Sequence, residues 1–271
     1  MMLIDGRPAT TVPASDRGLN YGDGLFETVR VHAGELPLFE RHLARLRDGC
    51  RRLGLPHPGD DAIRADARAL LADGALEGVL RIVLTHGDGG RGYAPPVDTP
   101  GRRIVSLHTL PAGLEGGMTA GVCETRLGDS PALGGLKHLG RLEQVLAARE
   151  TAVAGWDEGL MLDASGWVVE GTRHNLFYWR NGHLYTPPLR STGVAGVMRA
   201  LVLESLPRAG VPGGEARLRY DDLHAIEGLL LCNAVAGLRV VERLEGRALG
   251  EGGDMRELKR ELRAAGVAWL G

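Results

Sequence analysis

Lys137 stands out among the residues that could do chemistry, because the chain has only one other lysine, Lys259, among its 32 lysines and arginines. It follows a Gly-Gly-Leu bend at residues 134–136. An amine can lose its proton and attack a carbonyl carbon, whereas a guanidinium cannot. This position therefore indicates a nucleophilic amine, with an ordinary surface lysine at the start of a helix as the alternative.

A strand expected over residues 25–32 gathers further polar groups on one face. Side chains alternate between the two faces of a strand. One face carries Leu25, Glu27, Val29 and Val31, and the other carries Phe26, Thr28, Arg30 and His32. The hydroxyl, guanidinium and imidazole of the second face favour a strand that lines a site, with a solvated edge strand as the alternative.

The clearest helix is expected over residues 39–53, where apolar side chains recur at helical spacing. It carries Arg45 three residues after His42, although Arg45 could also be one cation among many on a basic helix. A later glycine-rich loop, residues 87–93, carries Arg91 and Tyr93 but lacks the ending of a phosphate-binding P-loop. We expect this loop to contact an anion, with a flexible hairpin connection as the alternative.

Glu170 ends an apolar strand expected over residues 167–170, where an unpaired carboxylate would be costly. A functional carboxylate and a salt-bridged structural acid both fit this position. A glycine-containing segment, residues 192–199, leads into a helix that is expected to run to about Ala209. The backbone amides at its start suit an anion such as phosphate, and an ordinary glycine-entered helix is the alternative.

Composition limits the possible partners and locations. The net charge of −2 argues against nucleic acid as the main partner. No apolar run is long enough to span a bilayer, and the N-terminus lacks the pattern of a signal peptide. The cysteines are scattered, so they predict buried apolar side chains and neither disulfides nor a metal site: Cys50, Cys123 and Cys232. We expect a cytoplasmic protein without a membrane partner.

The remaining pattern predicts two domains. Helices are expected over residues 60–71, about 138–155 and 254–265, the second of them with Leu142, Val145, Leu146 and Ala148 as its apolar positions. Residues 15–18 are expected to form a polar turn. A glycine-rich linker at residues 113–117 would separate an N-terminal domain, residues 1–112, from a C-terminal domain, residues 118–271, that carries Lys137.

Three blocks give the chain a resemblance to a known family: YGDGLFETVR (residues 21–30), GGLKHLGRLEQ (134–144) and VVEGTRHNLF (168–177). They resemble the fold-type IV pyridoxal-phosphate enzymes, a group that includes branched-chain and D-amino-acid aminotransferases and aminodeoxychorismate lyases. The resemblance implies a two-domain α+β fold, with a smaller N-terminal α/β sandwich and a larger C-terminal pseudo-barrel. It also implies a homodimer.

The same resemblance assigns cofactor contacts. Lys137 matches the lysine that forms a Schiff base with pyridoxal 5'-phosphate. Glu170 matches the carboxylate beside the pyridine nitrogen, and Arg45 matches an arginine that binds the phosphate. The resemblance also implies a phosphate cradle formed by the backbone amides of Val197 and Met198, together with Asn233 and Ala234.

Within the group, the RGYAPP sequence and Thr28 are most similar to the aminodeoxychorismate lyases, because many aminotransferase relatives have glycine at the position of Thr28. Lyase activity implies 4-amino-4-deoxychorismate as substrate and 4-aminobenzoate, a folate precursor, and pyruvate as products. Thr28 would then take part in proton transfer, with Arg91, Arg30 and Tyr93 as candidates for contacting the substrate.

Two alternatives remain open. An aminotransferase for branched-chain or D-amino acids would share Lys137, Glu170 and Arg45. A non-catalytic binding protein could retain the fold, and Gly140 favours this alternative because the lyases usually have a polar residue there. Lyase activity predicts pyruvate release without an added keto acid.

Overall fold

The computed structural model describes residues 1–89, 92–113 and 116–270. The chain divides into two compact units: unit 1 comprises Met1–Ala112 and Leu136–Gly140, and unit 2 comprises Gly113–Gly135 and Arg141–Gly271. Residues 114 and 115 of the expected linker lie outside the described residues. The sequence analysis assigned Lys137 to the C-terminal domain, whereas the short segment that carries it packs with unit 1.

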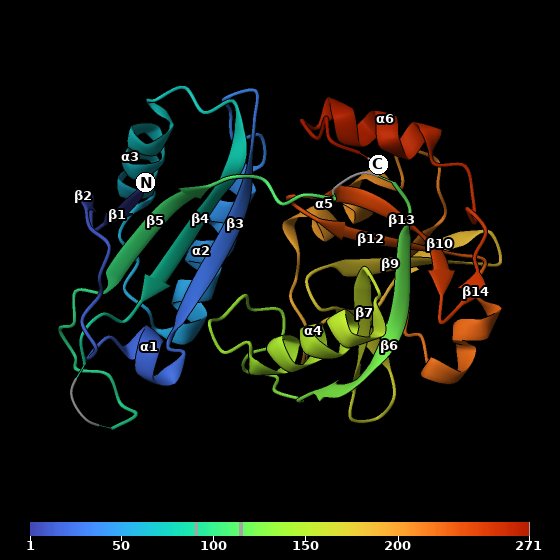
Figure 1. The fold of residues 1–271 in the computed structure, drawn as a ribbon, viewed down its shortest axis with the longest axis horizontal. Coiled ribbons are helices and arrows are strands. Elements are labelled where there is room, and N and C mark those ends of the chain that lie inside the picture. Colours follow the sequence, from blue (N-terminus) through green and yellow to red (C-terminus); the bar gives the residue numbers. More distant parts are fainter. Residues whose placement is uncertain (90–91, 114–115, 271) are drawn as a thin grey trace. The chain divides into compact units, whose positions relative to one another are not determined.

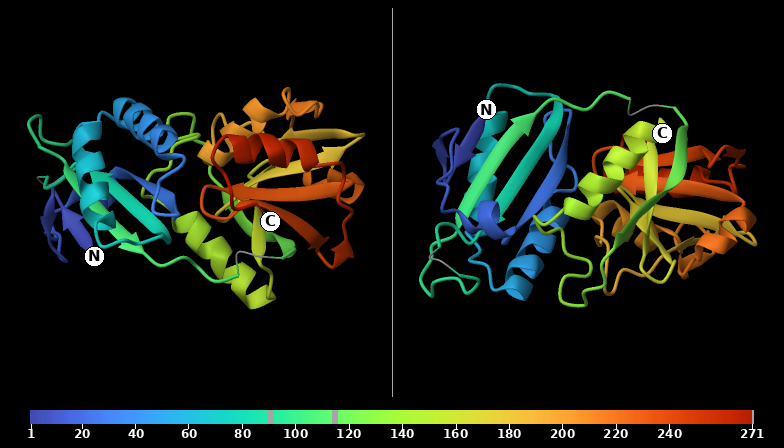
Figure 2. Two further views of the ribbon diagram at one scale, coloured as in Figure 1. Left: turned by 90° about the horizontal axis from the view of Figure 1, so that it is seen from above. Right: turned by 60° about the horizontal axis from the view of Figure 1, so that its bottom comes forward.

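Unit 1 is a two-layer sandwich (Figure 1). Its antiparallel sheet has the order β2-β1-β5-β4-β3 and consists of β1 (Met2–Ile4), β2 (Arg7–Pro8), β3 (Gly24–His32), β4 (Glu77–Thr85) and β5 (Arg102–His108). Helices α2 (Phe39–Leu53) and α3 (Asp60–Leu71) cover one face of this sheet (Figure 2). The alternation expected for β3 is confirmed, because Leu25, Val29 and Val31 are buried in the core with Leu43 and Leu46 of α2.

A short helix replaces the polar turn expected at residues 15–18. Helix α1 (Arg17–Tyr21) begins after Asp16, whose carboxylate accepts a hydrogen bond from the backbone amide of Gly18. Gly22 ends it in the left-handed conformation, at φ 67°. The acidic cap and the closing glycine are the sequence signals of this helix.

Unit 2 is built on a curved mixed sheet (Figure 1). The strand order is β11-β10-β9-β12-β13-β6-β7-β8, with β14 paired to β13. The strands are β6 (Met118–Leu127), β7 (Glu158–Asp163), β8 (Val168–Gly171), β9 (Asn175–Arg180), β10 (His183–Thr186), β11 (Gly213–Glu215), β12 (Gly228–Asn233), β13 (Gly237–Leu244) and β14 (Arg247–Ala248). Helix α4 (Leu142–Ala154) packs on β6 and β7, and α5 (Val197–Ser205) packs on β12 and on α6 (Arg256–Ala264). A 3₁₀ helix, η1 (Tyr220–Ala225), precedes β12.

Three helices have boundaries that differ from expectation. Helix α4 begins at Leu142, four residues after the expected start, because the preceding residues pair with a strand in unit 1. Helix α5 ends at Ser205 rather than near Ala209, because Pro207 has no backbone N–H with which to continue it. Helix α6 spans Arg256–Ala264, slightly less than the expected 254–265.

The apolar side chains expected to anchor α4 are instead exposed. Leu142, Val145 and Leu146 have exposed fractions of 71%, 45% and 42%, whereas Ala147 and Thr151 are buried. The pattern showed a helix but selected the wrong face for packing. The three cysteines are buried and unpaired as predicted, and burial raises the pKa values of Cys50 and Cys232 to about 12.

Candidate functional site

Lys137 lies on an extended segment that pairs with the start of β3. Its carbonyl accepts a 3.0 Å hydrogen bond from the amide of Phe26, and the amide of Leu139 donates one of 3.0 Å to Gly24. A Cβ at Gly24 would lie only 2.7 Å from Cδ1 of Leu139, so the glycine allows this approach. Two motifs that are more than 100 residues apart in sequence therefore meet within unit 1.

The ring of Phe26 contacts two cationic side chains. The amine of Lys137 lies 4.3 Å from the ring centre, and the Arg81 guanidinium lies 4.6 Å from it. Arg81 pairs in register with Thr28, so the side chains of both residues lie on the face of the sheet opposite α2 and α3. Thr28, the predicted catalytic hydroxyl, thus shares a face with a cation that the sequence analysis did not single out.

Arg81 has an unusual environment for an arginine. Burial lowers the pKa of its half-buried guanidinium. In the described part of the chain it forms no ion pair with a carboxylate, and its guanidinium lies over the face of the Phe26 ring. A charge in the middle of a β-branched strand was the sequence signal for this residue.

Arg45 is held by a buried acid. Glu27 of β3 is only 1% exposed, and its Oε1 accepts a 2.7 Å hydrogen bond from Nε of Arg45. Its Oε2 accepts bonds from Nη2 of Arg45, at 2.5 Å, and from Nδ1 of His42, at 2.6 Å. The spacing that drew attention to His42 and Arg45 thus places both side chains on one carboxylate, which the sequence analysis had listed with the apolar face.

The three residues expected to contact the substrate have different environments. Arg30 donates a 2.7 Å hydrogen bond to Glu77, so this candidate already has an anionic partner. Tyr93 is 86% exposed, its ring lies edge-on to Tyr21, and its carbonyl accepts a bond from Arg17. Arg91 lies outside the described residues.

Unit 2 holds the predicted acid, Glu170, near the end of β8. The side chain is 4% exposed, and its Oε2 accepts a 2.8 Å hydrogen bond from the amide of Val194. Asn175, on β9, donates 2.8 Å to the Val194 carbonyl and 3.4 Å to Oε2 of Glu170. Backbone and amide donors therefore favour the ionised carboxylate.

The same loop leads into the amino-terminal end of α5. Gly196 precedes the helix, and no side chain among the described residues caps it. A Cβ at Gly196 would collide with Oδ1 of Asn175, so the loop approaches β9 through the missing side chain. Val197 and Met198 occupy the first turn, where backbone amides point along the helix axis. This end of α5 therefore offers donors close to Glu170.

Asn233 ends β12 and organises the turn that follows. Its Oδ1 accepts hydrogen bonds of 2.9 Å from the amide of Val235 and 2.7 Å from that of Ala236. Its Nδ2 donates 3.3 Å to the carbonyl of Arg173. The side chain of Asn233 thus supports the backbone around Ala234, and the proposed phosphate contact at these two residues would come from the backbone.

A second buried acid, Glu158 on β7, braces the loop after Glu170. It is fully buried and accepts a 2.9 Å bond from the amide of Thr172 and one from Nδ1 of His174. Burial raises the pKa of Glu158, but these donors outweigh that effect and lower it overall. Glu158 therefore holds the loop that follows Glu170 in place through Thr172 and His174.

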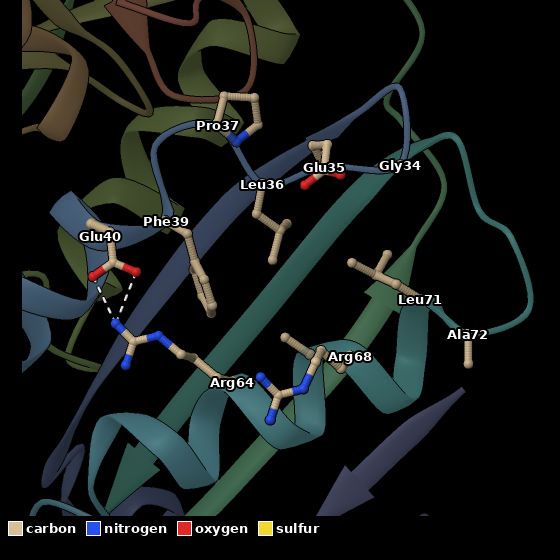
Figure 3. Close-up of a pocket in the computed structure, with 11 residues that line it drawn as sticks. Gly34, Glu35, Leu36, Pro37, Phe39, Glu40, Arg64, Arg68, Leu71 and Ala72 are labelled. Carbon is tan, nitrogen blue, oxygen red and sulfur yellow. Dashed lines mark hydrogen bonds and ion pairs between the residues drawn. The ribbon is translucent and has the colours of Figure 1, made fainter.

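A pocket of about 480 Å³ on unit 1 lies elsewhere, between the turn after β3 and the helices (Figure 3). Its lining includes Phe39, Leu71 and two arginines, of which Arg64 donates to both carboxylate oxygens of Glu40. No predicted site residue lines it. Within residues 1–89, 92–113 and 116–270, no cluster of three His, Cys, Asp or Glu side chains could bind a metal, and no helix could cross a membrane.

Comparison with known proteins agrees with the motif blocks. The chain is 36% identical over 246 residues to the aminodeoxychorismate lyase of Vibrio harveyi, covering 89% of this chain and 90% of that protein. The crystal structure of 4-amino-4-deoxychorismate lyase from Pseudomonas aeruginosa is 45% identical, has a TM-score of 0.89 and is matched over 97% of this chain and 98% of that one.

A more distant structure shows the fold alone. The branched-chain amino acid aminotransferase of Escherichia coli is 23% identical, with a TM-score of 0.87 over 100% of this chain and 94% of that one. The family match and the two lyase relatives confirm the resemblance to fold-type IV enzymes. The model of the amino-transferase class IV family matches residues 24–244, so the chain belongs to that family.

Proposed function

We propose that the chain is an aminodeoxychorismate lyase that uses pyridoxal 5'-phosphate to cleave 4-amino-4-deoxychorismate into 4-aminobenzoate and pyruvate. The similarity to two proteins of that name supports the assignment. The observation that carries it is the helix-free face of unit 1, where Thr28 and Arg81 occupy paired positions and Lys137 contacts the neighbouring Phe26. This face combines an amine, a hydroxyl and an available cation.

The chemistry of the residues fits this cofactor. An amine able to form a Schiff base is supplied by Lys137, and a buried carboxylate for a pyridinium nitrogen is supplied by Glu170. The uncapped start of α5, with the amides of Val197 and Met198, suits a phosphate. Arg45 and the backbone at Asn233 and Ala234 would complete the phosphate contacts.

Each of these residues then has a definite task. When bound, the cofactor supplies an electron sink for the carbon that loses a proton. Lys137 would accept the proton from C4 of the substrate, and Glu170 would keep the pyridine nitrogen of the bound cofactor protonated. As the bond between the ring and the enolpyruvyl oxygen breaks, the Thr28 hydroxyl would deliver a proton to the methylene of the enolpyruvyl group, which becomes the methyl group of pyruvate. The proton that Lys137 removed from C4 balances the one delivered. Loss of the enolpyruvyl group makes the substrate ring aromatic, and this favours cleavage.

Arg81 is our proposed cation for a substrate carboxylate. The substrate carries two carboxylates, and an arginine can bind one through two parallel hydrogen bonds. The Arg81 guanidinium is half-buried and lies over an aromatic ring, so a bound anion would stabilise its positive charge. Arg30, Arg91 and Tyr93 remain further candidates for the second carboxylate.

Assembly and location belong to the same proposal. A homodimer is supported by apolar side chains that α4 leaves exposed, including Leu142 and Val153, which are 71% and 91% exposed. Such a patch favours association with another surface. Synthesis of a folate precursor would take place in the cytoplasm.

An aminotransferase is the second candidate, because the family includes both activities and Lys137, Glu170 and Arg45 would serve either. The decisive assay incubates the purified protein with 4-amino-4-deoxychorismate and no keto acid. Release of equal amounts of 4-aminobenzoate and pyruvate is expected. Turnover that requires an added keto acid would instead identify an aminotransferase.

The two lysines provide a matched pair for the covalent step. Borohydride reduction of the holoenzyme followed by peptide mass spectrometry should place the cofactor on Lys137. Lys137→Ala should lose both the adduct and the activity, whereas Lys259→Ala should keep both. Thr28→Gly tests the proton-transfer role, and lyase activity equal to that of the unmodified enzyme would remove Thr28 from the mechanism.

A further inference from the structure

The acid Glu27 occupies a position where the strand pattern calls for an apolar side chain. It lies between Leu25 and Val29 on the face of β3 that packs against α2, and it is 1% exposed. Removing a carboxylate from water is costly, and a buried ion pair is often no more stabilising than an apolar replacement. Stability alone therefore does not account for an acid here.

The carboxylate of Glu27 accepts hydrogen bonds from the side chains of Arg45 and His42. Both oxygens of Glu27 accept from Arg45, through Nε at 2.7 Å and Nη2 at 2.5 Å. Two parallel bonds of this kind fix the plane of the guanidinium as well as its distance. Because α2 and β3 supply the two partners, the position of Arg45 is set by the core of unit 1.

His42 supports the same carboxylate. Its Nδ1 lies 2.6 Å from Oε2 of Glu27, so the imidazole donates from Nδ1. Its Nε2 is buried and has no hydrogen-bond partner among the described residues, as suits a neutral ring. Burial lowers the pKa of His42, in agreement with this assignment. The cluster thus contains one negative and one positive charge.

We infer that Glu27 is a positioning residue for the cofactor phosphate, holding the Arg45 guanidinium in a fixed orientation with His42 as its second support. This inference rests on the proposed role of Arg45. A rigid guanidinium loses less side-chain entropy when it binds an anion. The carboxylate also cancels the charge of Arg45, so the arginine would act through geometry more than through net charge.

This distinction makes the two possible effects of Glu27→Gln opposite in sign. If Arg45 acts only as a charge, removing the neighbouring negative charge should tighten binding of a phosphate. If Glu27 acts by positioning, the same change should weaken it. The expected loss is about tenfold in affinity for pyridoxal phosphate, which corresponds to one charge-assisted hydrogen bond.

The experiment titrates the apo form of the full chain with pyridoxal phosphate and, separately, with pyridoxal, following the visible absorbance of the bound cofactor. Glu27→Gln should lower the affinity for pyridoxal phosphate and leave the affinity for pyridoxal unchanged. In an Arg45→Met background it should have no further effect. Glu77→Gln, which removes the exposed partner of Arg30 on the same sheet, is the matched control and should leave the ratio of the two affinities unaltered.

Unchanged or tighter binding of pyridoxal phosphate by Glu27→Gln would overturn the inference. So would equal losses for both ligands, or a loss that persists without Arg45, because Glu27 would then act on the fold. If Arg45→Met itself leaves the affinity unchanged, Arg45 does not bind the phosphate and the inference fails with that assignment. The lyase assay on the unmodified enzyme tests the proposed function separately. If Glu27→Gln does not fold, Glu27→Met supplies a buried apolar replacement.

Discussion

The backbone amide of Val194 donates a 2.8 Å hydrogen bond to Oε2 of Glu170, so the loop before α5 holds the carboxylate that ends an apolar strand. Asn175 joins the two by donating to the carbonyl of Val194 and to Glu170. The acid and the uncapped helix end are therefore parts of one hydrogen-bonded structure. A change in the loop before α5 should therefore alter the position of the Glu170 carboxylate and that of the amino-terminal end of α5.

Replacement of Asn175 by leucine tests this connection. The variant keeps the volume but removes the donor to a buried carbonyl and a buried carboxylate, so it should lower the free energy of unfolding by about 1–3 kcal/mol. It should also weaken cofactor binding. Urea unfolding of the apo form and absorbance titration of the cofactor measure the two effects. Asn20→Leu, at an exposed position of helix α1, is the control, and equal losses in both variants would contradict a special role for Asn175.

Arg81→Lys keeps the positive charge but removes the planar fork. If Arg81 binds a substrate carboxylate, KM for 4-amino-4-deoxychorismate should rise about tenfold, as expected for the loss of one charge-assisted hydrogen bond. Cofactor affinity should not change. The comparison is Arg30→Lys, whose guanidinium is paired with Glu77. Steady-state kinetics at saturating cofactor would count against the assignment if Arg30→Lys raised KM and Arg81→Lys did not.

The pKa of Glu27 makes stability depend on pH. Burial raises this pKa, but Arg45 and His42 outweigh burial and lower it from 4.5 to about 2. The unfolded chain therefore binds the proton first, and stability that is complete above pH 4.5 is lost as the pH falls toward 2. The amount is about 3 kcal/mol.

Urea unfolding between pH 7 and pH 3 measures this dependence. Glu27→Gln should show a shallower decline of unfolding free energy below pH 4.5 than the unmodified chain. Glu40→Gln, whose carboxylate is 72% exposed, should retain the original slope. A slope that is identical in all three proteins would show that Glu27 does not carry the low pKa.

The sequence was informative where local pattern decides structure. The stripe on residues 39–53 and the alternation on residues 25–32 predicted α2 and the inner face of β3, because burial follows those periods directly. The three motif blocks identified the family for a different reason, since they preserve the residues around a cofactor. These predictions needed no knowledge of long-range packing.

Long-range pairing explains what the sequence missed. Lys137 was expected at a helix start, but hydrogen bonds to Phe26 and Gly24 extend the chain there. Arg81 became a candidate only when its register with Thr28 was known. Glu27 could have been recognised as a charge at an apolar position, yet its partners lie on a separate helix. Such contacts depend on which elements pack together, and periodicity does not specify that.

Glu158 stabilises the loop that follows Glu170. Glu158 is fully buried and bonds to Thr172 and His174, so Glu158→Gln breaks a buried pair and should lower the free energy of unfolding by about 3 kcal/mol or more. The loss should appear first in residues 171–175 as faster hydrogen exchange, measured by mass spectrometry of the folded protein. Glu150→Gln removes a partly exposed carboxylate that accepts hydrogen bonds from the backbone amides of Glu124 and Thr125, and it should leave residues 171–175 protected. Uniformly faster exchange throughout unit 2 in Glu158→Gln would contradict this prediction. It would mean that the acid stabilises the whole sheet and not residues 171–175 in particular.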